Sequence, residues 1–218
     1  MKTMFGRMIL FATGLALAAP ALAAPKAASG DDTLRRKAYA YAARVVWCAT
    51  PASRDKLLQT EIGSSAEAKA ASKMQALTRQ CTSDMPPVSP MLLRNVTASM
   101  VYDEEFRRGD PHVPTNAPLP ATFAVVPPDR QGTEAQQNLW YVASIANCLT
   151  YADPDLSRKL VLADPDAASE EEAFGKLKPA LGRCLRPGAA FPISALDFRG
   201  VLAEQLLKRS RAVRASRK

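Results

Sequence analysis

The chain has 218 residues and a formal net charge of +8. Most of this charge lies at the ends, because residues 208–218 contain six basic side chains and no acidic one, and residues 1–23 contain two basic ones. Residues 24–207 are therefore neutral, with 21 basic and 21 acidic side chains, which argues against a general basic surface for nucleic acid.

The first residues have the order of a secretory signal peptide. Lys2 and Arg7 precede an apolar run over residues 8–19, and Ala21-Leu22-Ala23 places small residues before a predicted cut after Ala23. This run of twelve residues is too short to span a bilayer, which needs about 20. We therefore expect a periplasmic or secreted protein that is not transmembrane once residues 1–23 are removed.

The chain repeats part of itself. YAARVVWCAT at 41–50 and YVASIANCLT at 141–150 have Tyr, Ala, Cys and Thr in the same relative places. A shift of 103 residues matches Glu67 to Glu170, and a shift of 105 matches Arg94 to Arg199. We interpret this pattern as the duplication of a unit of about 65–70 residues.

The first copy, residues 31–106, is predicted to be helical. Its apolar residues recur every three or four positions, as on one face of an amphipathic helix. The predicted faces are Leu34, Ala38, Tyr41, Val45 and Cys48 in a first helix and Ala70, Met74, Leu77 and Cys81 in a third. Side chains that can accept hydrogen bonds at helix starts are Asp31 or Asp32, Ser53, and Ser64 or Ser65.

The second copy, residues 133–208, repeats this order and begins with a helix predicted over 134–149. The sequence ADPD occurs at 152–155 and at 163–166, and its carboxylates could serve as calcium ligands. We favour helix starts instead, because proline suits the first helical position and acids suit the first turn. No metal is expected.

Residues 107–132 are rich in proline, which excludes a regular helix and predicts an extended connection. The sequence therefore predicts an all-α protein made of two tandem four-helix repeats, each stapled by a disulfide and joined by this proline-rich linker.

The four cysteines are expected to form two disulfides after export, and three pairings are conceivable. The duplication favours Cys48 with Cys81 and Cys148 with Cys184, because each copy then carries its own bond. Each bond is expected to stabilise the fold by about 3–4 kcal/mol. The alternative to disulfides is that the cysteines bind zinc, but the chain has no C-x-x-C pair and only one histidine.

No catalytic or cofactor-binding residue is predicted. His112, the only histidine, lies in the linker, and a Ser-His-Asp triad would have to use it. Ser53-Arg54-Asp55-Lys56 matches S-x-x-K but lacks the partner motifs of penicillin-recognising enzymes. Glu104-Glu105 is a carboxylate pair of the kind that glycoside cleavage uses, and nothing in its spacing separates it from a solvated helix face.

The last residues are predicted to form a basic tail, 209–218. The final helix loses its apolar face near Leu207, so we expect the chain beyond it to be mobile and its truncation there to leave melting nearly unchanged. Basic side chains near an anionic envelope surface attach a protein in a salt-sensitive way. The candidate anion-binding residues are Lys208, Arg209, Arg211, Arg214, Arg217 and Lys218.

The repeated YA…C helix, the LL…E…C segment and the R-x-V-x-A helix that ends in 198–207 together resemble a group of exported bacterial proteins. Those proteins contain a duplicated helical, cysteine-bearing module. The resemblance covers most of residues 34–207, departs from the expected glycine at Asn95, and implies no established activity. The order of helices, cysteines and prolines is also similar to small helical immunity proteins of secretion systems.

These features predict an exported, non-enzymatic helical protein that binds another envelope component, either a protein or an anionic surface. The alternatives are a protein that binds a small lipid, an immunity-type protein that binds a toxin, and an envelope hydrolase that uses carboxylates.

Overall fold

The computed structural model describes residues 29–82, 86–108, 132–165, 168–185 and 195–216, and the regular secondary structure within these ranges is entirely helical. The elements are α1 (Ser29–Cys48), α2 (Pro51–Leu58), α3 (Ser65–Leu77), η1 (Arg79–Cys81), α4 (Pro90–Phe106), α5 (Glu134–Ala152), α6 (Pro154–Leu162), α7 (Ala168–Cys184) and α8 (Ala195–Ser216). The predicted signal peptide, linker residues 109–131 with His112, and the last two basic residues lie outside the described ranges.

Short polar side chains set most helix starts, as capping chemistry predicts. Ser64 accepts a hydrogen bond from the backbone N–H of Glu67, and Asp153 accepts one from Leu156, so both predicted starts are confirmed. Asp153 precedes Pro154, whose missing N–H costs nothing at the first helical position.

Two predicted starts are wrong. α2 is capped by Thr50 and not by Ser53, because Pro51 occupies the first turn and moves the cap upstream. α1 begins at Ser29, so Asp31 and Asp32 lie within the helix and not before its start.

The buried faces of α1 and α3 also differ from the predicted ones. Leu34 and Leu77 belong to the predicted faces but are 67% and 64% exposed. Both helices are rich in alanine, so apolar positions cover more than one face and periodicity alone does not select between them. The buried positions are Ala42, Val45 and Val46 in α1, followed by Ala49 just beyond its end, and Glu67, Ala71 and Met74 in α3.

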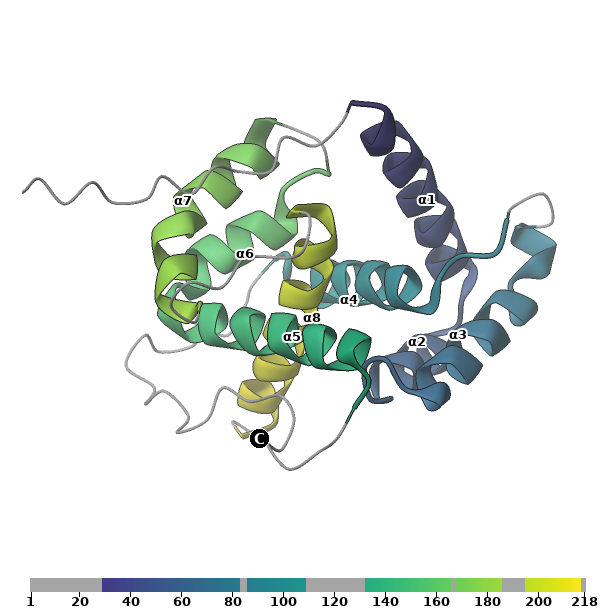
Figure 1. Cartoon of the computed structure of the whole chain (residues 1–218). Coiled ribbons are helices and arrows are strands. Elements are labelled where there is room, and N and C mark those ends of the chain that lie inside the picture. The colour runs from purple at the N-terminus through teal and green to yellow at the C-terminus, as the bar shows by residue number, and fades with distance from the viewer. Residues whose placement is uncertain (1–28, 83–85, 109–131, 166–167, 186–194, 217–218) are drawn as a thin grey trace, which may run out of the picture.

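The helices are arranged around a central crossing of α4 and α8. α1, α2 and α3 lie on one side of this pair and α6 and α7 on the other, with α5 packed along α8 (Figure 1). At the crossing, a Cβ atom added to Gly200 would lie 2.2 Å from the Cβ of Asn95. Glycine is therefore needed at 200 for the two backbones to approach this closely.

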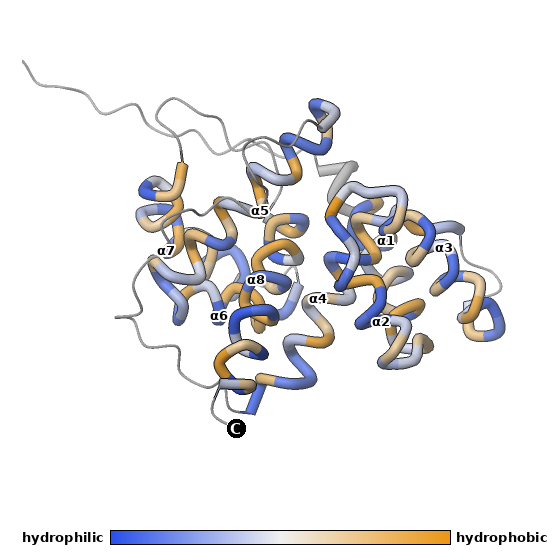
Figure 2. Tube along the Cα trace, turned by 90° about the horizontal axis from the view of Figure 1, so that it is seen from below, coloured by the Kyte–Doolittle hydropathy of each residue, from blue (hydrophilic) through white to orange (hydrophobic). Residues whose placement is uncertain are grey.

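Two hydrophobic clusters meet on α4. Its first half packs with α1, α2 and α3 through Leu93 and Val96, whereas its second half packs with α5 to α8 through Val101, Tyr102 and Phe106. Hydrophobic and hydrophilic positions alternate along the helices of both sides (Figure 2). Because α4 belongs to both clusters, a substitution at the crossing of α4 and α8 should affect the packing of both.

The two disulfides have the cysteine pairing that the sequence predicts, although Cys81 lies beyond the end of α3 and not within it. Cys48 at the end of α1 is bonded to Cys81 in η1, and Cys148 in α5 is bonded to Cys184 at the end of α7. The Cα atoms are 6.3 and 5.8 Å apart, within the range of ordinary disulfides. Each bond therefore closes one of the two sides covalently.

The end of α8 departs from the sequence prediction. The helix does not end near Leu207 but continues to Ser216, and Ser210 is fully buried. Arg211 explains this continuation, because its guanidinium reaches Asp55 on α2 at 2.9 Å and Glu105 on α4. No described helix is long and apolar enough to cross a membrane.

Candidate functional site: two buried arginines and an open groove

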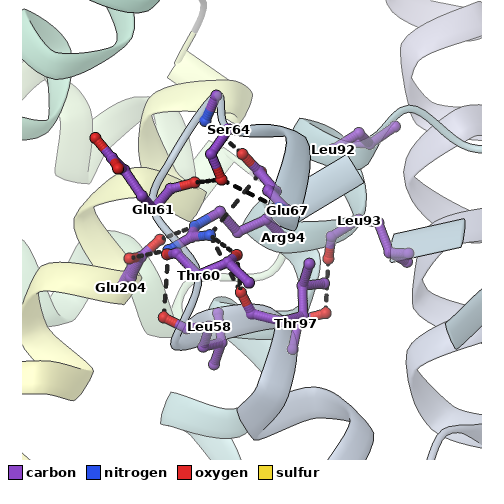
Figure 3. A network of polar contacts seen from close by, with 12 residues as sticks. Leu58, Thr60, Glu61, Ser64, Glu67, Leu92, Leu93, Arg94, Thr97 and Glu204 are labelled. Atoms are coloured by element: carbon purple, nitrogen blue, oxygen red, sulfur yellow. Dashed lines mark hydrogen bonds and ion pairs between the residues drawn. The ribbon is translucent and has the colours of Figure 1, made fainter. Parts of the chain in front are cut away.

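Arg94 of α4 lies at the centre of a buried polar network, with only 1% of its side chain exposed (Figure 3). It donates to the carbonyl oxygens of Leu57, Leu58 and Thr60, which lie at the end of α2 and just beyond it. The Leu57 carbonyl also accepts from the backbone N–H and the hydroxyl of Thr60. Arg94 therefore adds donors at a helix end, where the last carbonyls have no further helical turn to bond with.

Glu204 of α8 completes the network. Its two oxygens accept from Nε and Nη2 of Arg94 at 2.7 and 2.8 Å, a bidentate geometry. Burial by itself would raise the pKa of Glu204, but the hydrogen bonds and charge of Arg94 outweigh it and hold that pKa below its ordinary value. The carboxylate is therefore ionised at neutral pH and ties α8 to α4.

Glu67 at the start of α3 is the third charged member. One of its oxygens accepts from the backbone N–H of Gly63, and the other lies 4.0 Å from Nη1 of Arg94. Burial raises the pKa of Glu67, and the nearby charge of Glu204 adds to the rise, whereas the Gly63 bond and Arg94 oppose it. The two glutamates beside Arg94 thus have pKa values displaced in opposite directions.

Arg199 of α8 has matching surroundings on the other side of the crossing. Its Nη2 donates to the carbonyl oxygen of Val161 at 2.8 Å, and its Nη1 lies 3.6 Å from Glu170 of α7. Val161 and Glu170 correspond to Leu58 and Glu67 under the shift of 103 residues that the sequence repeat shows. The repeat was the only sequence signal for this pair of sites, because the charges themselves look like ordinary helix surface.

An open groove of about 560 Å³ lies between α1, α3 and the extended segment after η1. Gln75 of α3 holds that segment by two hydrogen bonds, donating to the carbonyl oxygen of Val88 and accepting from its N–H. Trp47 near the end of α1 and Leu77 at the end of α3 are 77% and 64% exposed, and neither lines the groove. The lining residues are Val45, Ser72, Gln75, Ala76, Arg79, Thr82, Pro86 and Pro87.

The predicted anion-binding residues mostly contact the protein itself. Lys208 pairs with Glu204, and Arg209 donates to the carbonyl oxygen of Thr150 and stacks on Tyr151. Arg211 and Arg214 both pair with Glu105, and the guanidinium of Arg214 lies 4.2 Å from the centre of the Phe106 ring. These groups anchor α8 to its neighbours.

The candidate carboxylates are likewise engaged, since Glu104 pairs with Arg54 and Glu105 with the arginines of α8. Within the described ranges, no group of three or more His, Cys, Asp or Glu side chains could hold a metal ion.

Comparison with protein-family models, with curated proteins and with solved structures finds no significant match for this chain.

Proposed function

We propose that this protein is an exported, non-enzymatic binding protein whose groove between α1 and α3 holds an extended segment of an envelope protein. The observation that carries the proposal is the groove itself, whose wall on α3 already binds an extended segment through the backbone of Val88. Its lining combines apolar side chains such as Val45 with polar ones such as Arg79 and Thr82, as surfaces that bind other proteins do.

The occupant is inferred from what the groove already holds. Gln75 binds the backbone of Val88 in the manner in which a neighbouring strand would, so this wall is suited to extended chain. Export is supported by the two disulfides, which are typical of oxidising compartments. Intact-mass measurement of the exported protein should find a chain that begins at Ala24.

The near-identical surroundings of Arg94 and Arg199 support the further proposal that residues 31–106 and 133–208 are copies of one unit. In this interpretation α4 and α8 are corresponding helices, and their crossing joins the copies.

The partner can be found and then tested with matched variants. Envelope extract is passed over wild-type protein and over Arg79→Ala, which removes a lining side chain of the groove. Lys73→Ala is the control, because Lys73 is an exposed basic residue of α3 outside the lining. A protein retained by wild type and by Lys73→Ala, and lost with Arg79→Ala, is the expected result. Equal retention by all three would contradict the proposal.

Extended peptides of the retained protein provide the direct measurement. Titration calorimetry of these peptides should show saturable binding to wild-type protein and to Lys73→Ala, and weaker binding to Arg79→Ala. Equal affinity for all three proteins would place the site elsewhere.

A further inference from the structure

Helix α1 lies at the edge of the molecule with α4 on its inner side, and its outer side combines basic side chains with a tryptophan (Figure 1). From Arg36 to the end of the helix, the exposed positions recur every three or four residues and therefore share one face. The opposite side, with Ala42 and Val46, packs into the cluster with α4. At about 1.5 Å per residue, the exposed face is about 17 Å long. We call it the outer face of α1, and its members are Arg36, Lys37, Ala40, Arg44 and Trp47.

Trp47 is the unusual member of this face, since 77% of it is exposed. Tryptophan is highly buried on average in folded proteins. The groove between α1 and α3 does not account for its exposure, because α1 lines that groove with Val45 and not with Trp47. An exposed tryptophan among Lys and Arg side chains is typical of helices that lie on a membrane surface, where the ring sits at the level of the lipid headgroups.

The charge around the outer face of α1 is positive. Residues 34–82 contain nine basic and three acidic side chains, a net charge of +6, so the rest of residues 24–207 carries −6. One of the three acids, Glu67, is buried. Within the described ranges, neither Lys37 nor Arg44 has a carboxylate partner. The neutral body of the chain is thus divided into a basic side and an acidic remainder, and its basic side favours a negatively charged partner.

We propose that the outer face of α1 binds the surface of an anionic phospholipid bilayer, with α1 lying parallel to that surface. Its basic side chains extend to the lipid phosphates while the Trp47 ring enters the headgroup layer. A stripe that is one helix wide suits a bilayer, because the flat lipid surface supplies phosphates along its whole length. The basic end of α8, which the sequence predicts for this role, mostly contacts the protein itself. Membrane contact does not depend on the groove, which lies on another side of α1.

Co-sedimentation of the exported protein with vesicles tests this assignment. Vesicles of equal parts phosphatidylglycerol and phosphatidylcholine should bind the protein at low salt, and vesicles of phosphatidylcholine alone should not. Binding should be lost at about 1 M salt, where charges are screened beyond about 3 Å. Absence of binding to the anionic vesicles, or equal binding to both kinds, overturns the proposal.

Tryptophan fluorescence identifies the contacting face. Trp47 is exposed whereas Trp140 is only 9% exposed, so a change on adding vesicles reports mainly on Trp47. Its emission should shift to shorter wavelength with the anionic vesicles and should be quenched when their lipids carry brominated chains. Vesicle binding that leaves the emission unchanged overturns the proposal, because the contact then lies elsewhere.

Two charge reversals with the same change in net charge locate the contact. Arg44→Glu alters the outer face of α1, and Lys178→Glu alters an exposed basic residue of α7 outside it. Arg44→Glu should weaken partitioning into anionic vesicles at least about tenfold, because each basic side chain near such a surface contributes about fivefold and the new carboxylate is repelled. Lys178→Glu should bind like wild type. If Arg44→Glu does not fold, Lys37→Glu takes its place with the same expectation.

Equal binding by the α1 and α7 variants overturns the assignment, since net charge alone would then explain attachment. Soluble polyglutamate is the probe for an acidic protein in place of a lipid surface. Weak binding of polyglutamate beside strong binding of anionic vesicles supports a bilayer. Polyglutamate that binds as tightly as the vesicles, with the same loss in Arg44→Glu, overturns the proposal in favour of an acidic protein.

Discussion

Replacing Glu204 by glutamine should weaken the whole fold, because this one carboxylate neutralises a guanidinium that both hydrophobic clusters surround. Arg94 and Glu204 are 1% and 3% exposed, and their two hydrogen bonds are 2.7 and 2.8 Å long. Removing one partner of such a buried pair costs about 3–5 kcal/mol. Glutamine keeps the size and one acceptor, and Glu67 remains 4.0 Å away, so we expect a loss of about 3 kcal/mol.

Urea unfolding at neutral pH with the disulfides intact, followed by far-ultraviolet circular dichroism, measures this loss. Arg94→Met should cost more than Glu204→Gln, since it also removes the donor that Arg94 supplies to the carbonyls of Leu58 and Thr60. Lys208→Met is the control, because Lys208 pairs with the same carboxylate from a half-exposed position and should contribute less than about 1 kcal/mol.

The direction in which the Glu204 pKa is displaced determines how folding stability changes with pH. The pKa of Glu204 is lowered in the folded protein, so its contribution to stability is present above the unfolded pKa and is lost as pH falls through the folded pKa. Glu204→Gln should therefore lose less stability on acidification than wild type does. A loss below about 1 kcal/mol at neutral pH, or an unchanged acid dependence, would refute this account of the pair.

Gly200→Ala should lower the free energy of unfolding by about 1–3 kcal/mol, because its Cβ would lie 2.2 to 2.8 Å from backbone and side-chain atoms of Asn95. Gly182→Ala, whose Cβ would have nothing within 4 Å, should raise the free energy of unfolding by about 0.5–1 kcal/mol when both variants are measured by urea unfolding. Truncation after Leu207 should lower the melting temperature, since it removes a buried part of α8 and its ion pairs, and unchanged melting would support a mobile tail. Burial raises the pKa of Glu67, so its contribution to stability is present below the unfolded pKa and is lost as pH rises through the folded pKa. Glu67→Gln should accordingly be at least as stable as wild type at neutral pH and lose that advantage on acidification, and a variant that is less stable at neutral pH would contradict this sign.

The elements that local chemistry controls could be predicted from the sequence. Ser64 and the Asp153-Pro154 pair begin helices without help from tertiary contacts, because their hydrogen bonds involve backbone groups only three residues away. The disulfide pairing could also be predicted, since the proposed duplication assigns one pair of cysteines to each copy.

Features that depend on distant parts of the chain could not be predicted in this way. Alanine-rich α1 and α3 have more than one apolar face, and only packing against α4 decides that Leu34 and Leu77 remain exposed. The basic end of α8 has no apolar face of its own, and it stays helical to Ser216 because acids on α2 and α4 lie within its reach.

The candidate sites show the same division. The repeat marks Arg94 and Arg199 as corresponding positions, but Arg94 meets Glu204 across 110 residues of sequence only because α4 and α8 cross at Gly200. Packing of α1 against α4 likewise decides that Lys37, Arg44 and Trp47 face outward. Local hydrogen bonds and periodicity are encoded within a few residues, whereas burial of charge depends on which helices the folded chain brings into contact.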